Sequence, residues 1–138
     1  MRYLRSIALL SLLALPFTTH ADMVVVTNAS NGVSQLSKTE IINIFMGRFQ
    51  KLSPSISAFP VDNVLLRPKF YQLLVGKAPS EINSYWARLV FSGRASPPRQ
   101  ISEPLELLDI VQNNKGAITY INQAAVDDTV RVVYAFPK

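Results

Sequence analysis

Two apolar runs near the ends of the chain constrain its fold more than any other feature. Residues 23–27 (MVVVT) are an unbroken run of apolar and β-branched residues bounded by polar ones, which is typical of a buried strand. Residues 117–121 (AITYI) predict another strand. Between them, apolar residues recur at helical spacing. We therefore expect an α/β domain, in which helices flank a mixed sheet of about four strands.

The segments between these runs carry recognisable start and stop signals for helices. Ser37 and Glu40 form a capping box, and Gly residues close most of the helical segments. Further strands are expected at residues 55–61, where Pro60 suggests the strand's end, and at residues 130–135. The expected helices begin and end near these residues: Ser37 and Gly47, Pro68 and Gly76, Ser80 and Gly93, Ser102 and Gly116.

Apolar residues that recur at the spacing of a helix or a strand are expected to be buried. The third and fourth helices are predicted to bury Val90 and Leu105 along with their other apolar residues, and the second to bury Leu73. The most firmly expected core residues are Val25, Ile44, Phe45, Phe70, Trp86, Leu89, Ile118 and Val132.

The first 21 residues have the pattern of a secretory signal peptide. Arg2 and Arg5 precede a short apolar run at residues 7–15, and small residues stand before a cleavage point at Asp22. That run is too short to span a bilayer as a helix. We expect residues 1–21 to be removed on export to the periplasm and residues 22–138 to form one domain; retention of the leader as an anchor is the alternative.

Composition limits the chemistry available to residues 22–138. The chain has no Cys, and its single His, His20, lies in the expected leader. Without Arg2 and Arg5, 12 Lys and Arg face 9 Asp and Glu, and these cations are scattered, which does not favour nucleic acid. Because no group titrates near neutral pH unaided, we expect no enzyme, no cofactor and no metal site.

Three segments, taken in order, resemble one known family. LSKTEIINIFMGR, FYQLLVGKAPSEINSYWARLVFSGRASPP and VQNNKGAITYI are similar to the ordered motifs of periplasmic phosphate-binding proteins of ABC importers and their small exported relatives. Thr119 stands where the family usually has Gly. The resemblance covers nearly all of residues 22–138, and it implies one lobe of a type II periplasmic-binding-protein-like fold.

The resemblance also implies a place for a ligand. The family holds phosphate without metal, and its phosphate loop leads into a helix whose first amides and positive dipole end suit an anion. The matching stretch here is VDNVLLRPKF, residues 61–70. Arg67-Pro68-Lys69 replaces the family's Ser-Gly-Thr, and Pro68 removes one amide. Arg67, Lys69 and Asn63 are therefore candidate ligand-binding residues, with solvated surface charge as the alternative.

Two other surfaces are candidates for binding. Asn28 and Ser30 follow the first strand, at a sheet edge of the kind where α/β proteins bind ligands. The stiff pair Pro97-Pro98, flanked by Arg94 and Arg99, could form an exposed docking loop. Neither pattern distinguishes binding from ordinary loop structure.

Two functions follow as hypotheses. The first is an exported, non-enzymatic domain that binds a small phosphate-like anion, weakly because one lobe supplies half of a two-lobed cleft. The second is a module that has lost the ligand and binds an envelope protein or another copy of itself.

Overall fold

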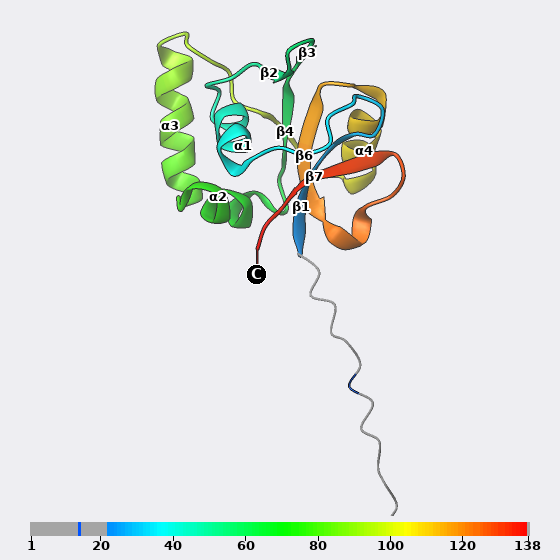
Figure 1. Cartoon of the computed structure of the whole chain (residues 1–138). Helices are drawn as coiled ribbons and strands as arrows, with labels where there is room; N and C mark the ends of the chain where they lie inside the picture. The colour runs from blue at the N-terminus through cyan, green and yellow to red at the C-terminus, as the bar shows by residue number, and fades with distance from the viewer. Residues whose placement is uncertain (1–13, 15–21, 138) are drawn as a thin grey trace, which may run out of the picture.

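A five-stranded mixed sheet forms the centre of the protein, and helices cover both of its faces (Figure 1). The computed structural model describes residue 14 and residues 22–137, so the predicted signal peptide lies, apart from residue 14, outside the described residues. The elements are β1 (Met23–Asn28), α1 (Lys38–Phe45), β2 (Lys51–Ser53), β3 (Ile56–Ser57), β4 (Phe59–Asn63), α2 (Arg67–Val75), α3 (Pro79–Phe91), β5 (Arg99–Ile101), α4 (Pro104–Asn113), β6 (Ala117–Asn122), the 3-10 helix η1 (Gln123–Ala125) and β7 (Val130–Ala135).

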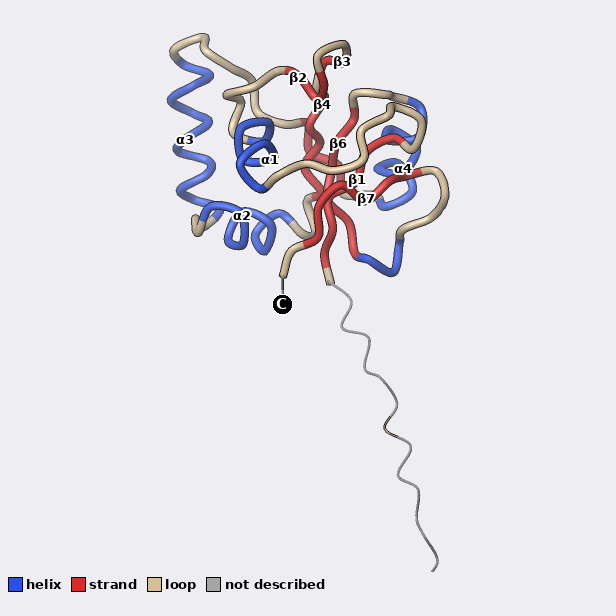
Figure 2. Tube along the Cα trace, in the orientation of Figure 1, coloured by secondary structure: helices blue, strands red, loops and turns tan. Residues whose placement is uncertain are grey.

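The strand order across the sheet is β5-β4-β6-β1-β7. β2 and β3 form a separate hairpin (Figure 2). β4 runs parallel to β5 and β6, whereas β1 runs antiparallel to β6 and β7. Four strands of the sheet therefore point the same way and β1 points the other way. We call the edge at which β4, β5, β6 and β7 end the carboxyl edge.

The alternation of side chains along β1 divides the core into two layers. Met23 and Val25 face α1, α2 and α3, whereas Val24 and Val26 face α4. Because both faces of the sheet are covered, β1 is buried along its whole length, as its unbroken apolar run predicted. The expected α/β fold with a mixed sheet flanked by helices is confirmed.

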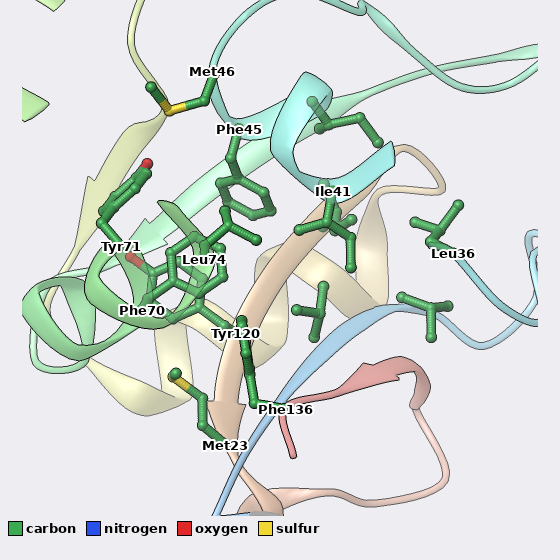
Figure 3. Close-up of a cluster of buried hydrophobic side chains, with 14 of the residues drawn as sticks. Met23, Leu36, Ile41, Phe45, Met46, Phe70, Tyr71, Leu74, Tyr120 and Phe136 are labelled. Atoms are coloured by element: carbon green, nitrogen blue, oxygen red, sulfur yellow. The ribbon is translucent and has the colours of Figure 1, made fainter. Parts of the chain in front are cut away.

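Aromatic rings fill the centre of the larger layer (Figure 3). Phe70 stacks on Tyr120 with ring centroids 3.6 Å apart, and Phe45 meets Phe70 edge-on at 4.8 Å. Among the predicted core residues, Leu89 and Val132 are only partly buried, and the others are buried.

Local signals in the sequence are confirmed where they rest on backbone hydrogen bonds. The Ser37 hydroxyl accepts from the Glu40 amide at 3.1 Å, and the Glu40 carboxylate accepts from the Ser37 amide at 2.6 Å. Gly76 closes α2 in the left-handed conformation at φ 67°. Ser80 and Ser102 were wrongly predicted as caps, because α3 and α4 begin at Pro79 and Pro104.

Pro60 was wrongly predicted to end its strand. The Phe59 amide, one residue earlier, donates to Gly116 O on the β6 side at 2.8 Å. Backbone N–H groups of successive residues in a strand point toward opposite neighbouring strands, so the nitrogen of Pro60 points toward β5. Pairing of β4 with β5 begins only at Val61. The missing N–H therefore breaks no hydrogen bond, and β4 continues to Asn63.

Three apolar residues that were expected inside are exposed, and two short strands were missed. Leu73, Val90 and Leu105 have exposed fractions of 39%, 52% and 82%. The missed strands, β2 and β5, have three residues each, too few for an alternating pattern to stand out. The strand predicted at residues 55–61 is divided into β3 and β4. In the described part of the chain, no helix is both long and apolar enough to cross a membrane.

Candidate functional site

The candidate site lies at the carboxyl edge, where β4 leads into α2. The paired register of β4 and β6 extends only to Pro60, and side chains bridge the two strands beyond it. The Thr119 hydroxyl donates to Val61 O at 2.7 Å, and Asn63 Nδ2 donates to Tyr120 O at 3.0 Å. Thr119 thus supplies a bond between strands that a Gly at this position could not.

A buried carboxylate organises this end of β4. Asp62 has an exposed fraction of 1% and accepts hydrogen bonds from the Tyr71 hydroxyl at 2.9 Å and the Tyr120 hydroxyl at 3.0 Å, both at Oδ1. Arg67 Nε donates to its other oxygen, Oδ2, at 3.2 Å, and Arg67 Nη2 donates to Asn83 Oδ1 at 3.1 Å. The guanidinium also lies over the Tyr71 ring, 5.4 Å from its centroid.

Burial and pairing act in opposite directions on this carboxylate. Removal from water raises the pKa of Asp62, and the hydrogen bonds of Tyr71 and Tyr120 and the charge of Arg67 oppose that rise, with burial prevailing. Burial and the neighbouring Asp62 charge raise the pKa of both tyrosines far above its ordinary value, so their hydroxyls stay protonated and donate. The cluster is an ion pair with two neutral donors.

Arg67 is therefore fixed rather than free. Its side chain is 12% exposed, and two of its five N–H groups have the partners described above. A guanidinium held in this way keeps further donors in a defined direction, but the Asp62 carboxylate offsets its charge. It lies in the first turn of α2, where backbone amides have no partner inside the helix.

Lys69 and Arg67 do not point toward the same place. The two residues are two positions apart on α2, so their side chains leave the helix on different sides. Arg67 reaches Asn83 on α3, whereas Lys69 lines a shallow hollow of about 180 Å³ beside Asp22 and Phe136. An anion at the start of α2 would meet one of these cations at short range, not both.

Asn28 and Ser30 lie at the opposite edge of the sheet. β1 runs antiparallel to β6, with Met23 paired to Asn122 and Thr27 to Ile118, so Asn28 is at the end farthest from α2. Its Nδ2 donates to Val111 O at 3.0 Å and to Gln112 O at 2.8 Å. Its Oδ1 accepts from the amide and the hydroxyl of Ser30. These two residues thus close the end of α4 and are separate from the other candidates.

Exposed apolar side chains also lie at the carboxyl edge, on the side of the sheet that α4 covers; we call this the apolar flank. Leu65 in the β4–α2 turn is 68% exposed, and Leu105 in the first turn of α4 is 82% exposed. Between α4 and the end of β6 lies a hollow of about 100 Å³, lined on the strand side by Ile121 and on the helix side by Leu107 and Leu108. This apolar flank was not predicted.

Sequence reasoning missed four members of the site: Asp62, Tyr71, Tyr120 and Asn83. An aspartate inside the apolar strand FPVDN was the available signal, because a buried carboxylate requires partners. The partners themselves lie 9 and 58 residues away along the chain, in α2 and β6. Among the described residues, no three His, Cys, Asp or Glu come together as ligands for a metal ion.

Comparison with known proteins gives matches in structure only. No protein-family model matches the chain, and neither does any curated protein. The fold is similar to an ABC-type phosphate transport receptor from Vibrio cholerae, with a TM-score of 0.63 and 16% identity over 82% of this chain and 45% of that one.

Two further solved structures agree with this result. One, from Clostridium perfringens, is assigned as a phosphate ABC transporter substrate-binding protein and contains bound phosphate; its TM-score is 0.64 at 19% identity, over 82% of this chain and 44% of that one. The other, from Planctomyces limnophilus, is assigned as phosphate binding, with a TM-score of 0.59 at 17% identity over 82% and 40%. The chain thus has the fold of part of such proteins and spans less than half their length, which confirms the expected single lobe.

Proposed function

We propose that this chain is an exported, non-enzymatic ligand-binding domain that holds a phosphate-like anion weakly at the first turn of α2. The observation that carries the proposal is Arg67, which Asp62 and Asn83 hold at the start of a helix on the carboxyl edge. Fixed donors at a helix start suit an oxyanion, because no side chain has to be ordered when the ligand arrives. The similarity in fold to proteins described as phosphate binding supports the same ligand class.

Weak binding follows from the number and setting of the donors. Charge-assisted hydrogen bonds contribute about 1.5–3 kcal/mol each when partly desolvated. On a single lobe the anion stays in contact with water, so the lower value applies. Two such bonds contribute about 3 kcal/mol, which corresponds to a Kd of several millimolar before the cost of association is subtracted. We therefore expect a Kd in the millimolar range or weaker.

Titration calorimetry with phosphate and with sulfate tests the proposal. Arg67→Lys keeps a cation beside Asp62 but removes the planar fork, and we expect it to weaken binding to below detection. Lys69→Ala should weaken binding by less, through the loss of a nearby exposed charge. Arg48→Ala, at the far end of the sheet, is the matched control and should bind as the unmodified chain does. Equal binding by the Arg48 and Arg67 variants would overturn the site.

A second function is favoured by the apolar flank of the same edge. Leu65 and Leu105 are exposed beside an apolar hollow, a setting typical of a surface that another protein covers. In this alternative the chain is an envelope protein-interaction module without a ligand. A photoreactive amino acid at position 65 should then form a specific protein adduct in cells, and one at the exposed position 128 should not. Adducts at neither position would contradict it.

A further inference from the structure

The end of the molecule opposite the candidate site is rich in cations, and these cations have no part in the proposed function. Residues 41–61 and 82–102 together carry five cations and no carboxylate. The two stretches meet in space: Trp86 and Ala95 both lie within 3.4 Å of where a Cβ on Gly47 would stand. The five cations are Arg48, Lys51, Arg88, Arg94 and Arg99.

Exposed apolar side chains stand among these cations. Phe91, the last residue of α3, is 96% exposed, and its neighbour Val90 is 52% exposed. Phe49, after the turn that ends α1, is 56% exposed. It lines a groove of about 310 Å³ together with Trp86 and Ala95. We call the set Arg48, Phe49, Arg88, Val90, Phe91 and Arg94 the basic–aromatic end.

The basic–aromatic end projects from the fold. The carboxyl end of α3 and the loop after it lie at the same end of the molecule as β2 and β3, away from α2 (Figure 1). In the described part of the chain, Arg48, Arg88 and Arg94 form no ion pair, whereas Arg99 lies 3.7 Å from Glu106. Their charge is therefore available to an outside partner.

We propose that the basic–aromatic end docks the protein on an anionic phospholipid surface. An almost fully exposed Phe at a projecting helix end has little contact with its own protein. A fluid bilayer accepts such a side chain without a pocket of matching shape, whereas a protein partner would have to supply that pocket. The cations are spread around the apolar residues on two segments, which fits a layer of anionic headgroups better than a single acidic group.

The docked arrangement follows from the nature of the side chains. Phe91 and Val90 enter the boundary between headgroups and acyl chains, and the arginines stay at headgroup level with their apolar stems alongside. The candidate anion site on α2 then faces away from the membrane, because it lies at the opposite edge of the sheet. The two proposals are independent, and variants of one end leave the other intact.

Co-sedimentation with lipid vesicles tests the proposal. The protein, in the form that cells export, is mixed with vesicles of phosphatidylcholine containing about 30% phosphatidylglycerol and with vesicles of phosphatidylcholine alone. We expect binding to the anionic vesicles that falls with added salt. Phe91→Ser should lower the partition coefficient about tenfold, and Arg94→Gln about fivefold. Every variant has the same N-terminus, so any contribution of residues 1–21 is common to all.

Leu105→Ser is the matched control, since Leu105 is also highly exposed but lies at the other edge. It should bind vesicles as the unmodified protein does, and circular dichroism should show that both Ser variants are folded. The proposal is overturned if the unmodified protein does not bind anionic vesicles above the neutral ones. It is also overturned if Phe91→Ser and Leu105→Ser lower binding equally, because exposure alone would then account for the effect.

Discussion

Replacement of Arg67 by Ala should unfold the protein more easily, and the loss should depend on pH. Asp62 is 1% exposed and its carboxylate has Arg67 as its ion-pair partner. Removing one partner of a buried ion pair costs about 3–5 kcal/mol, because the remaining charge is left uncompensated. The two tyrosine hydroxyls still donate to Asp62, so the lower part of this range applies.

Protonation of Asp62 sets an upper limit on that loss. An Asp in the unfolded chain has a pKa of about 3.9, so protonating it at pH 7 costs about 4 kcal/mol. This cost falls by about 1.4 kcal/mol for each pH unit below 7. Burial already raises the pKa of Asp62 in the folded protein, and loss of Arg67 raises it further. A raised folded pKa gives stability that is complete below the unfolded pKa and is lost as pH rises through the folded pKa. The deficit of Arg67→Ala should therefore be about 3–4 kcal/mol at pH 7 and no more than about 1.5 kcal/mol at pH 5.

Urea unfolding of four proteins measures this coupling: the unmodified chain, Arg67→Ala, Asp62→Asn and the double variant. The double variant should be more stable at pH 7 than Arg67→Ala alone, because it leaves no unpaired charge. A deficit below about 1 kcal/mol for Arg67→Ala at pH 7, or one that does not change with pH, would refute a buried and coupled pair.

Three further changes test the packing and the electrostatics. Trp86→Ala should cost about 3–5 kcal/mol in thermal unfolding, since Trp86 is 4% exposed, and a loss below about 1 kcal/mol would contradict its place in the core. Gly116→Ala should lower stability by about 2 kcal/mol or more, because the new Cβ would lie 2.0 Å from Ser57 O. Gly76→Ala should cost about 1–2 kcal/mol, because the space around it is open but its backbone is left-handed. If Gly116→Ala costs less than Gly76→Ala, the close approach of β3 to β6 is wrong. Phosphate affinity, measured by calorimetry, should fall as sodium chloride is raised, and an affinity independent of salt would argue against an anion at α2.

The sequence predicted those parts of the fold that short-range patterns determine. The capping box of Ser37 and Glu40 and the Gly76 helix end depend on residues within one turn, and they are confirmed. Helical phase was predicted less well in α4, where Leu105, Leu108 and Val111 were expected inside. Val111 is buried and Leu108 is partly buried, but Leu105 is exposed. Leu107 and Val111, four residues apart on one face, are the buried pair, and Leu105 leaves the helix on another side.

The site could be predicted only in outline, since long-range contacts form it. The position of Arg67 and Lys69 at a helix start followed from Pro68 and Gly76. Among the described residues, Arg67 has an ion-pair partner, Asp62, and Lys69 has none. The sequence predicted the strand that carries Asp62 but not the residues that contact its side chain. Asn28 and Ser30, predicted as a separate candidate surface after the first strand, lie at the edge opposite the carboxyl edge because β1 runs antiparallel to the rest of the sheet. A short apolar run does not show the direction of its strand.

Residue-level NMR during a phosphate titration tests the proposed anion site most directly. Amide resonances of Lys69 and Phe70, at the start of α2, should shift in proportion to occupancy, with a half-saturation in the millimolar range. Those of Asn28 and Ser30 should stay unchanged, because they lie at the opposite edge. Unchanged α2 resonances at phosphate concentrations of tens of millimolar, or shifts confined to the Asn28 edge, would contradict the proposed function.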